Sequence, residues 1–183
     1  MQLEVQTGRP KDLAGREEKE IAVYDFLDKL GISYERVDHE AAHTMEACAP
    51  VEEALQAKVC KNLLLTNSKH SFYYLLMMPG DKTFVTKELS NAIDCGHLSF
   101  AEPSEMEKVL HCTPGSASVF GLMNDEEDLV ELLVDRELLK EEYLCAHPCK
   151  NTSTLKVKTK ELFGKFLKAT KHYKTDVSLK GEG

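Results

Sequence analysis

The sequence predicts an α+β fold built on a mixed, mostly antiparallel sheet. Two apolar runs, residues 62–66 and 72–78, are joined by a short polar segment that contains Asn67-Ser68-Lys69-His70, which is typical of a β-hairpin. The other strand-like runs are separated by single helical segments, without the regular strand–helix alternation of a doubly wound parallel sheet. With 183 residues, the chain is long enough to bury the core of one domain.

The first half of the chain is expected to contain helices on either side of a short strand, followed by the hairpin. Apolar residues recur at helical spacing from Ile21 to Leu30, and Gly31 is a typical helix stop. Residues 1–12 lack periodicity and predict a loose lead-in, before one domain over 13–179 and a tail over 180–183. In order, we expect a helix over 18–30, a strand over 33–37, a helix over 44–56 that is interrupted at Pro50, and hairpin strands over 62–66 and 72–78.

The second half alternates short helices and strands. Pro103 suits the first position of a helix, and the small residues 113–118 predict a loop. We expect helices over 85–93, 103–110, 135–140 and 159–170, and strands over 98–101, 119–123, 129–134, 143–146, 152–157 and 173–177.

Charge is distributed unevenly along the chain. The formal net charge is −8, but from Lys150 onward nine lysines face three acidic residues, a net +6 that leaves −14 for the rest. In the last helix Lys165 and Lys168 follow the outer stripe together with His172, while Leu162 and Phe166 belong to the inner one. Such a stripe suits a selective anionic partner better than bulk DNA, although a solvated helix face explains it equally well.

Cysteines and hydropathy bear on the compartment and on metal binding. The chain has neither an apolar run long enough to span a bilayer nor an apolar signal-peptide core, so we expect a cytoplasmic protein without a membrane partner. Its six cysteines are then expected to be reduced thiols. The run Cys145-Ala-His147-Pro-Cys149 holds metal-ligand residue types but matches no paired Cys-x-x-Cys site, so we expect no metal site and no cofactor.

Three short segments carry polar groups of useful chemistry: Lys61-Asn62 at the start of a strand, the loop Gly115-Ser116-Ala117-Ser118, and His147-Pro148 followed by Asn151-Thr152. A loop of small residues can present backbone N–H groups to an oxyanion or a phosphate. Taken alone, each segment has a plainer interpretation: a solvated strand end, an ordinary turn and a structural histidine. No Walker loop, nucleophile elbow, His-Glu-x-x-His or dinucleotide fingerprint is present in the sequence.

In combination these segments resemble a known family. Lys61 to Leu65, Gly115 to Asp125 and His147 to Thr154 are similar, in order and spacing, to the YbaK/ProX family of freestanding prolyl-tRNA editing proteins, and most similar to its ProX (PrdX) branch. The resemblance extends over roughly residues 20–179 and includes the closing helix around Phe166 to His172. It implies a mixed β-barrel-like sheet flanked by helices, and hydrolysis of an amino acid wrongly attached to proline tRNA. In the ProX branch that amino acid is usually alanine, and in the YbaK branch it is cysteine.

The resemblance also implies roles for individual residues. The expected catalytic residues are Lys61, Asn62, Gly115 and His147, and the expected substrate contacts are Ser116, Ala117, Ser118, Val119, Asn151 and Thr152. Lys165 and Lys168 are expected to contact tRNA. The expected partner is mischarged tRNA(Pro), with help from prolyl-tRNA synthetase or an elongation factor left open. One departure stands out, because the family loop commonly reads Gly-x-x-x-Pro and this chain has Val119 in place of the proline.

Two other interpretations remain open at the level of sequence. A non-catalytic module of the same fold that recruits tRNA or a synthetase is favoured by Val119, since proline would stiffen the loop. A small-ligand or metal-binding protein would be built on the run from Cys145 to Cys149. For an editing enzyme we expect direct attack of water rather than an acyl-enzyme on Ser116. Alanine, serine and cysteine remain close competitors as the amino acid removed, because one methylene is worth only about 1–3 kcal/mol of discrimination.

Overall fold

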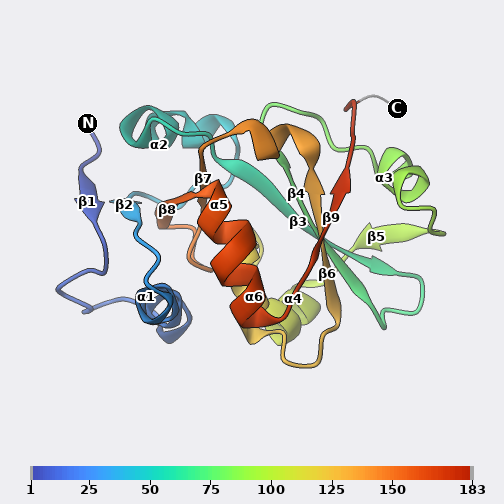
Figure 1. Cartoon of the computed structure of the whole chain (residues 1–183), viewed down its shortest axis with the longest axis horizontal. Coiled ribbons are helices and arrows are strands. Elements are labelled where there is room, and N and C mark those ends of the chain that lie inside the picture. Colours follow the sequence, from blue (N-terminus) through green and yellow to red (C-terminus); the bar gives the residue numbers. More distant parts are fainter. Residues whose placement is uncertain (1, 182–183) are drawn as a thin grey trace.

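A computed structural model describes residues 2–181 and contains two β-sheets that lie side by side (Figure 1). The first sheet has the order β1-β2-β8-β7 and is antiparallel throughout, and the second has the order β5-β3-β4-β6-β9. In the second sheet β3 pairs antiparallel with β4 and β5, while β6 pairs parallel with β4 and β9. The strands are β1 (Val5–Thr7), β2 (Glu35–Asp38), β3 (Cys60–Asn67), β4 (Tyr73–Pro79), β5 (Leu98–Phe100), β6 (Val130–Asp135), β7 (Tyr143–Ala146), β8 (Ser153–Lys158) and β9 (Lys174–Val177). The predicted α+β class with a mixed, mostly antiparallel arrangement is confirmed.

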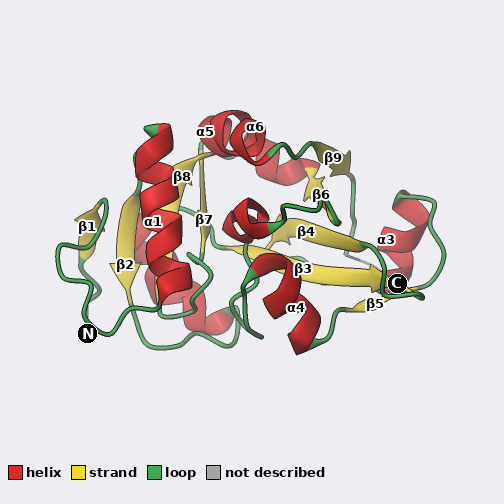
Figure 2. Cartoon of the chain, turned by 90° about the horizontal axis from the view of Figure 1, so that it is seen from below, coloured by secondary structure: helices red, strands yellow, loops and turns green. Residues whose placement is uncertain are grey.

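The helices cover both sheets and fill the space between them (Figure 2). They are α1 (Glu18–Leu30), α2 (Ala49–Leu55), α3 (Thr86–Ala92), α4 (Pro103–Leu110), α5 (Thr159–Glu161) and α6 (Leu167–Thr170), and a π-helical turn over Leu162–Phe166 joins the last two. Short 3-10 helices lie at Glu46–Cys48, Val119–Asn124 and Arg136–Lys140. Within residues 2–181 no helix has the length and apolar character that a membrane span requires.

The second sheet is buried on both faces. Along β4, Leu75 and Met77 belong to the larger core with α1, α4 and the α5–α6 helix, whereas Leu76 and Met78 belong to a smaller core beside α3. This alternation follows from the two-residue period of a strand. It explains why the strand runs are continuously apolar, as the sequence predicts for a sheet covered on both sides.

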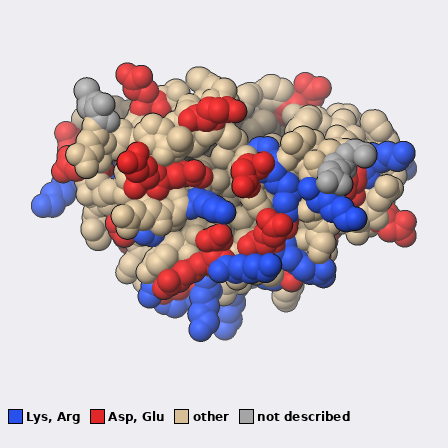
Figure 3. Space-filling model, turned by 90° about the horizontal axis from the view of Figure 1, so that it is seen from above, with Lys and Arg blue, Asp and Glu red and all other residues tan. Residues whose placement is uncertain are grey.

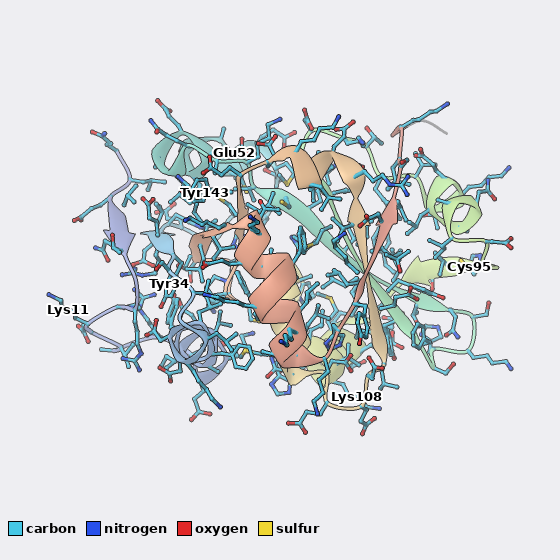
Figure 4. The ribbon with its side chains drawn as sticks, in the orientation of Figure 1. Lys11, Tyr34, Glu52, Cys95, Lys108 and Tyr143 are labelled. Atoms are coloured by element: carbon cyan, nitrogen blue, oxygen red, sulfur yellow. The ribbon has the colours of Figure 1, made fainter. Side chains whose placement is uncertain are left out.

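The two sheets share the larger core, and within residues 2–181 a single β-bridge links their strands. An isolated parallel bridge links Val59, just before β3, to Cys145 on β7, and the Cys145 N–H donates to the Lys58 carbonyl at 3.1 Å. On α2, Glu52 accepts a hydrogen bond from the Val59 N–H at 2.8 Å and so fixes the start of β3; Figure 4 labels Glu52 on α2 and Tyr143 on β7. In the described part of the chain the sheets are therefore joined without closing a barrel.

The strand predicted over residues 119–123 is wrong, because this segment forms the 3-10 helix Val119–Asn124. Ser118 begins that helix, and its hydroxyl oxygen accepts a hydrogen bond from the Phe120 N–H at 3.1 Å. A Cβ atom on Gly121 would lie 2.8 Å from the Leu110 carbonyl oxygen, so only glycine allows the end of α4 to pack this closely. The cap and the glycine outweigh the apolar pattern that favoured a strand.

Two further segments differ from expectation. Residues 5–7, expected within the loose lead-in, form β1 and pair with β2. His172, expected on the outer stripe of the last helix, is buried, and its Nε2 lies 2.8 Å from the Asp125 carboxylate. The helix ends at Thr170 and Lys171 adopts a left-handed conformation, which turns the chain inward before His172. The domain boundaries stay a prediction, and residues 1, 182 and 183 lie outside the described residues.

The 3-10 helix is also tied to β3. The Val119 N–H donates to the side-chain Oδ1 of Asn62 at 3.0 Å, a bond that proline could not make. Val119 nevertheless occupies the first position of its helix, where proline is tolerated. Ser118, which precedes it, has the extended backbone (φ −151°, ψ 144°) that a residue before proline requires.

We expect Val119→Pro to change the free energy of unfolding by less than about 1.5 kcal/mol. The lost hydrogen bond is worth about 1 kcal/mol and is offset by about 0.4–1 kcal/mol from the stiffer unfolded chain. Urea denaturation would measure the change. Val119→Ala is the matched control, because it keeps the N–H but removes buried methyl groups at a cost of about 2 kcal/mol. A proline variant less stable than the alanine variant would contradict this account.

Candidate active site

A cavity of about 480 Å³ lies where the start of β3 approaches the end of β7. The bridge between Val59 and Cys145 sets this approach, since Lys61 follows the first and His147 the second by two residues. Of the predicted site residues, the cavity is lined by Lys61, Asn62, Gly115, Ala117 and His147. Three segments that are far apart in the sequence therefore share one site, as the resemblance implies.

Lys61 is held at the cavity wall by the turn that follows β4. Its ammonium donates to the carbonyl oxygen of Lys82, and two of its three N–H groups remain for a ligand. Lys82 is fixed in turn, because its own ammonium bonds the Asp135 carboxylate at 2.7 Å and the Leu179 carbonyl oxygen at 2.6 Å. The position of Lys61 thus depends on β6 and on the segment after β9.

Asn62 ties β3 to the loop over residues 113–118. Besides accepting from the Val119 N–H, its carboxamide donates to the Cys60 carbonyl at 3.3 Å. Both ends of the side chain are therefore engaged within the protein. This geometry makes Asn62 a residue that positions the loop rather than one that is free to hold a ligand.

The loop over residues 113–118 is a tight turn closed by Ser116. The Ser116 hydroxyl accepts from the Thr113 N–H at 3.0 Å and donates to the Thr113 carbonyl at 2.9 Å. Gly115 has φ +86°, a left-handed conformation that side chains other than glycine's rarely adopt. Within residues 2–181 the N–H groups of Gly115 and Ala117 donate to no protein acceptor. Two free donors at the cavity wall are what an oxyanion requires.

His147 presents a free ring nitrogen. Its Nδ1 lies 2.8 Å from the Ser153 carbonyl oxygen, which can only accept, so Nδ1 carries the proton. In the described residues Nε2 has no protein partner and is left as an acceptor. Burial lowers the pKa of His147, and the nearby His39 lowers it further, whereas the bond to Ser153 opposes the shift. The imidazole is therefore neutral at pH 7 and able to take up a proton.

His39 packs near His147 and shares a hydroxyl partner with it, a role that the sequence did not predict. The two rings lie 5.9 Å apart between centroids, and His39 Nε2 lies 2.8 Å from the Thr154 hydroxyl. The same hydroxyl is 3.3 Å from Nδ1 of His147. Because His39 Nδ1 donates to the Glu40 carbonyl, its Nε2 accepts from Thr154 when the ring is neutral.

Other residues of the cavity were also missed. His43 is exposed at the rim, and its Nδ1 would lie 3.6 Å from a Cβ atom on Gly115. The apolar wall comes from the segment after β2, from β3, from the end of β5 and from α4, and includes Met45, Leu63, Phe100, Pro103 and Met106. Two histidines four residues apart in a polar loop, His39 and His43, were the only sequence signal for this part of the site.

Several predicted contacts lie outside the cavity. Three of them are buried and do not line the cavity: Ser116 and Ser118 within the loop, and Val119 directly after it. The Asn151 amide nitrogen would lie 3.4 Å from a Cβ on Gly115, at the edge of the site, while Thr152 lines a separate polar cavity of about 880 Å³ beside the lead-in.

Lys165 and Lys168 are exposed on the α5–α6 helix and do not line the active-site cavity. Lys165 pairs with Glu161 at 3.4 Å. The helix lies near β9, at one edge of the second sheet (Figures 1 and 2). The cavity is lined by residues of β3 and β5, toward the other edge. Figure 3 shows basic side chains protruding along the lower edge of one face, with acidic ones between them.

Metal-ligand residue types converge at one place in residues 2–181, formed by Asp125, Asp128 and His172. Asp125 already accepts from the N–H groups of Leu129 and Val130, at 2.9 and 3.0 Å, and pairs with His172. These bonds explain the cluster as a support for the loop before β6. Cys145, His147 and Cys149 do not bring three ligand atoms within 4.8 Å of one another.

The arrangement combines a cation, two free backbone donors and a neutral imidazole around one cavity. Such groups can bind an anion, stabilise an oxyanion and accept a proton from water, which together are the requirements of ester hydrolysis. The Ser116 hydroxyl is not free to act as a nucleophile, because it is buried and both accepts and donates a hydrogen bond within the loop.

Comparisons with known proteins agree with this chemistry. Residues 39–164 match the family model described as the aminoacyl-tRNA editing domain. The prolyl-tRNA editing protein ProX of Acetoanaerobium sticklandii is 32% identical over 141 residues, which cover 77% of this chain and 86% of that protein. Prolyl-tRNA synthetase associated domain-containing protein 1 of Danio rerio is 29% identical over 150 residues, covering 81% and 80%.

The fold is similar as well. A solved structure provisionally described as a trans-editing enzyme for prolyl-tRNA synthetase superposes with a TM-score of 0.66 at 18% identity, covering 91% of this chain and 99% of that one. At this identity the likeness concerns the fold alone. The sequence matches carry the assignment, and the chain belongs to the aminoacyl-tRNA editing domain family.

Proposed function

We propose that this protein is a trans-editing deacylase that removes alanine from mischarged tRNA(Pro) by direct attack of water on the aminoacyl ester. The observation that carries the proposal is the single cavity shared by the Lys61 ammonium, the free N–H groups of Gly115 and Ala117, and the unpaired Nε2 of His147. The relatives named for prolyl-tRNA editing and for association with prolyl-tRNA synthetase support the choice of tRNA(Pro).

Each group has a step in the proposed reaction. His147 Nε2 takes a proton from water, whose oxygen attacks the ester carbonyl, and the N–H groups of Gly115 and Ala117 stabilise the resulting oxyanion. Lys61 binds the terminal phosphate or polarises the carbonyl. The ester bond then breaks, the ribose oxygen takes back the proton from His147, and free amino acid and tRNA leave. Asn62 acts as a positioning residue, because it holds the loop that carries the two donors.

The choice of alanine rests on what the resemblance to the ProX branch implies and on the apolar lining of the site. The wall around Met45, Leu63 and Met106 is apolar, which favours a small apolar side chain over a polar one. Discrimination by one methylene or a hydroxyl in such a pocket is only about ten- to two-hundredfold. Hydrolysis of Ala-, Ser-, Cys- and Pro-tRNA(Pro), measured side by side, tests the proposal. If cysteine or serine were released fastest, that amino acid would replace alanine as the proposed substrate. If no amino acid were released, the remaining interpretation would be a non-catalytic module that binds tRNA or a synthetase.

The non-catalytic alternative loses its main support in the structure. It rested on Val119, which lacks the stiff ring of the family proline. In this chain the bond from the Val119 N–H to Asn62 restrains the same point of the loop. The same hydrolysis assay, repeated with prolyl-tRNA synthetase or an elongation factor added, would show whether either protein changes the rate.

We expect Lys61→Ala to lose most of the deacylation while the fold persists. Removing a positioned electrostatic contact from an active site costs on the order of a hundredfold in rate, whereas the lost bond to the Lys82 carbonyl costs about 1 kcal/mol of stability. Single-turnover hydrolysis of Ala-tRNA(Pro) and a melting curve measure the two effects. Lys69→Ala, an exposed lysine of the hairpin turn, is the control. If Lys61→Ala and Lys69→Ala hydrolysed Ala-tRNA(Pro) at equal rates, Lys61 would have no role in the mechanism.

We expect the rate to fall in acid because His147 must be neutral. Its folded pKa is lowered by burial, so the acid limb lies below the ordinary histidine pKa of about 6.5. His147→Gln should lower the plateau rate by about a hundredfold and abolish the acid limb. The lowered pKa also means that the stabilisation from the neutral ring is complete above about pH 6.5 and is lost as the pH falls through the folded pKa. Rate profiles between pH 5 and 8.5 check this; an acid limb that persists in the variant would contradict the assignment.

We expect Lys165→Gln and Lys168→Gln to weaken tRNA capture without changing the saturated rate, since phosphate contacts act by releasing counterions. The slope of log K against log salt concentration should fall by about one unit for each contact removed. Binding of tRNA(Pro) between 50 and 200 mM salt measures the slope, with Lys69→Gln as control. An unchanged slope would show that the lysines form a solvated helix face.

A further inference from the structure

Phe100 is an exposed aromatic ring at the wall of the active-site cavity. Its exposed fraction is 56%, although large apolar side chains are usually covered. The other exposed large apolar residues in residues 2–181 are Val5, Leu139 and Tyr173, and none of them lines this cavity. An exposed aromatic ring at the wall of this cavity is therefore a candidate contact for a bound ligand.

The ring of Phe100 is held in place before any ligand arrives. Phe100 pairs with Leu65 across β5 and β3, and the next residue, Ala101, donates its N–H to the Leu64 carbonyl at 3.0 Å. Phe84 packs edge-on against the ring, with centroids 5.6 Å apart and an interplanar angle of 61°. This edge contact leaves the faces of the Phe100 ring open. Because the fold already orders the side chain, a ligand that binds there loses little further side-chain entropy.

The proposed substrate, an aminoacyl-tRNA, carries a planar nucleobase that could lie against the ring of Phe100. The aminoacyl ester is attached to the ribose of the terminal nucleotide, so a base lies one sugar away from the carbonyl. With the carbonyl between Lys61, Gly115 and His147, the sugar points out of the cavity past one of its walls. The wall formed by Phe100 is apolar and aromatic, and stacking on an aromatic ring is how single-stranded nucleic acids are held independently of sequence.

We propose that Phe100 is the stacking platform for the terminal nucleobase of the tRNA acceptor end. This inference rests on the proposed function, and it adds a residue that positions the substrate without touching the reacting atoms. It assigns the base to the β5 side of the cavity.

The chain itself provides a direct binding test. It contains no tryptophan, so Phe100→Trp introduces a single fluorescent reporter at the proposed platform. The trinucleotide CCA, which needs no attached amino acid, should quench this fluorescence by stacking. Tyr173→Trp is the matched control, because Tyr173 is 89% exposed outside the cavity. Equal quenching at the two positions, or none at Phe100→Trp, would overturn the proposal even if the protein hydrolysed no aminoacyl-tRNA.

A kinetic test separates stacking from structural support. We expect Phe100→Ala and Phe100→Leu to lower kcat/KM for Ala-tRNA(Pro) by about tenfold or more, mainly through KM, and Phe100→Tyr to remain near wild type. The alanyl ester of 1-methoxyribose keeps the sugar but lacks the base, so its hydrolysis should be equal in all four proteins.

Two outcomes of the kinetic test would contradict the platform. Equal losses on both esters would indicate that Phe100 supports the pocket wall, and a Phe100→Leu enzyme as active as wild type on tRNA would show that an aromatic face is not needed. Melting curves of each variant identify any loss that arises from disturbed packing with Phe84. A wild-type enzyme inactive on every aminoacyl-tRNA would refute the proposed function, and the trinucleotide experiment would then decide on Phe100 by itself.

Discussion

The hydrogen bond from the Val119 N–H to the Asn62 side chain is the constraint on which the rest of the site depends. It joins the first residues of a central strand to a loop more than fifty positions later in the chain. Without it, the turn closed by Ser116 would be attached to the sheet only through its own ends. With it, the loop that carries the free N–H groups of Gly115 and Ala117 is restrained beside the strand that carries Lys61, and restrained donors are the condition for electrostatic stabilisation without reorganisation.

A second constraint concerns the neutral imidazole at the cavity. Lys61 is fixed by its hydrogen bond to the Lys82 carbonyl oxygen, whereas burial and the nearby His39 lower the pKa of His147 and favour its neutral ring. The bond to the Ser153 carbonyl fixes the tautomer, so that Nε2 is the basic nitrogen of a residue that lines the cavity. One small site can therefore hold a cation for binding and a base for proton transfer at the same pH.

Local patterns predicted most elements of this chain, and long-range packing decided the rest. The hairpin, the helix after Pro103 and the stop at Gly31 follow from signals within a few residues of each other, and all are present. The parallel placement of β6 and β9 depends on which edge is free once β3 and β4 have paired, which no local signal reveals. Residues 119–123 mislead because a strand and a buried 3-10 turn both need apolar residues. Lys61, Gly115 and His147 meet as predicted, but the supporting His39 lies in a loop without periodicity.

The clamp on Lys82 couples the order of synthesis to the assembly of the site. The carbonyl of Leu179 that holds the Lys82 ammonium belongs to a segment made more than a hundred residues after Lys61. A nascent chain can form the hairpin of β3 and β4 on the ribosome and still lack this anchor. Lys61 then acquires its fixed position only when the segment after β9 has joined the fold, so under the proposed mechanism the binding cation is set in place later than the strand that carries it.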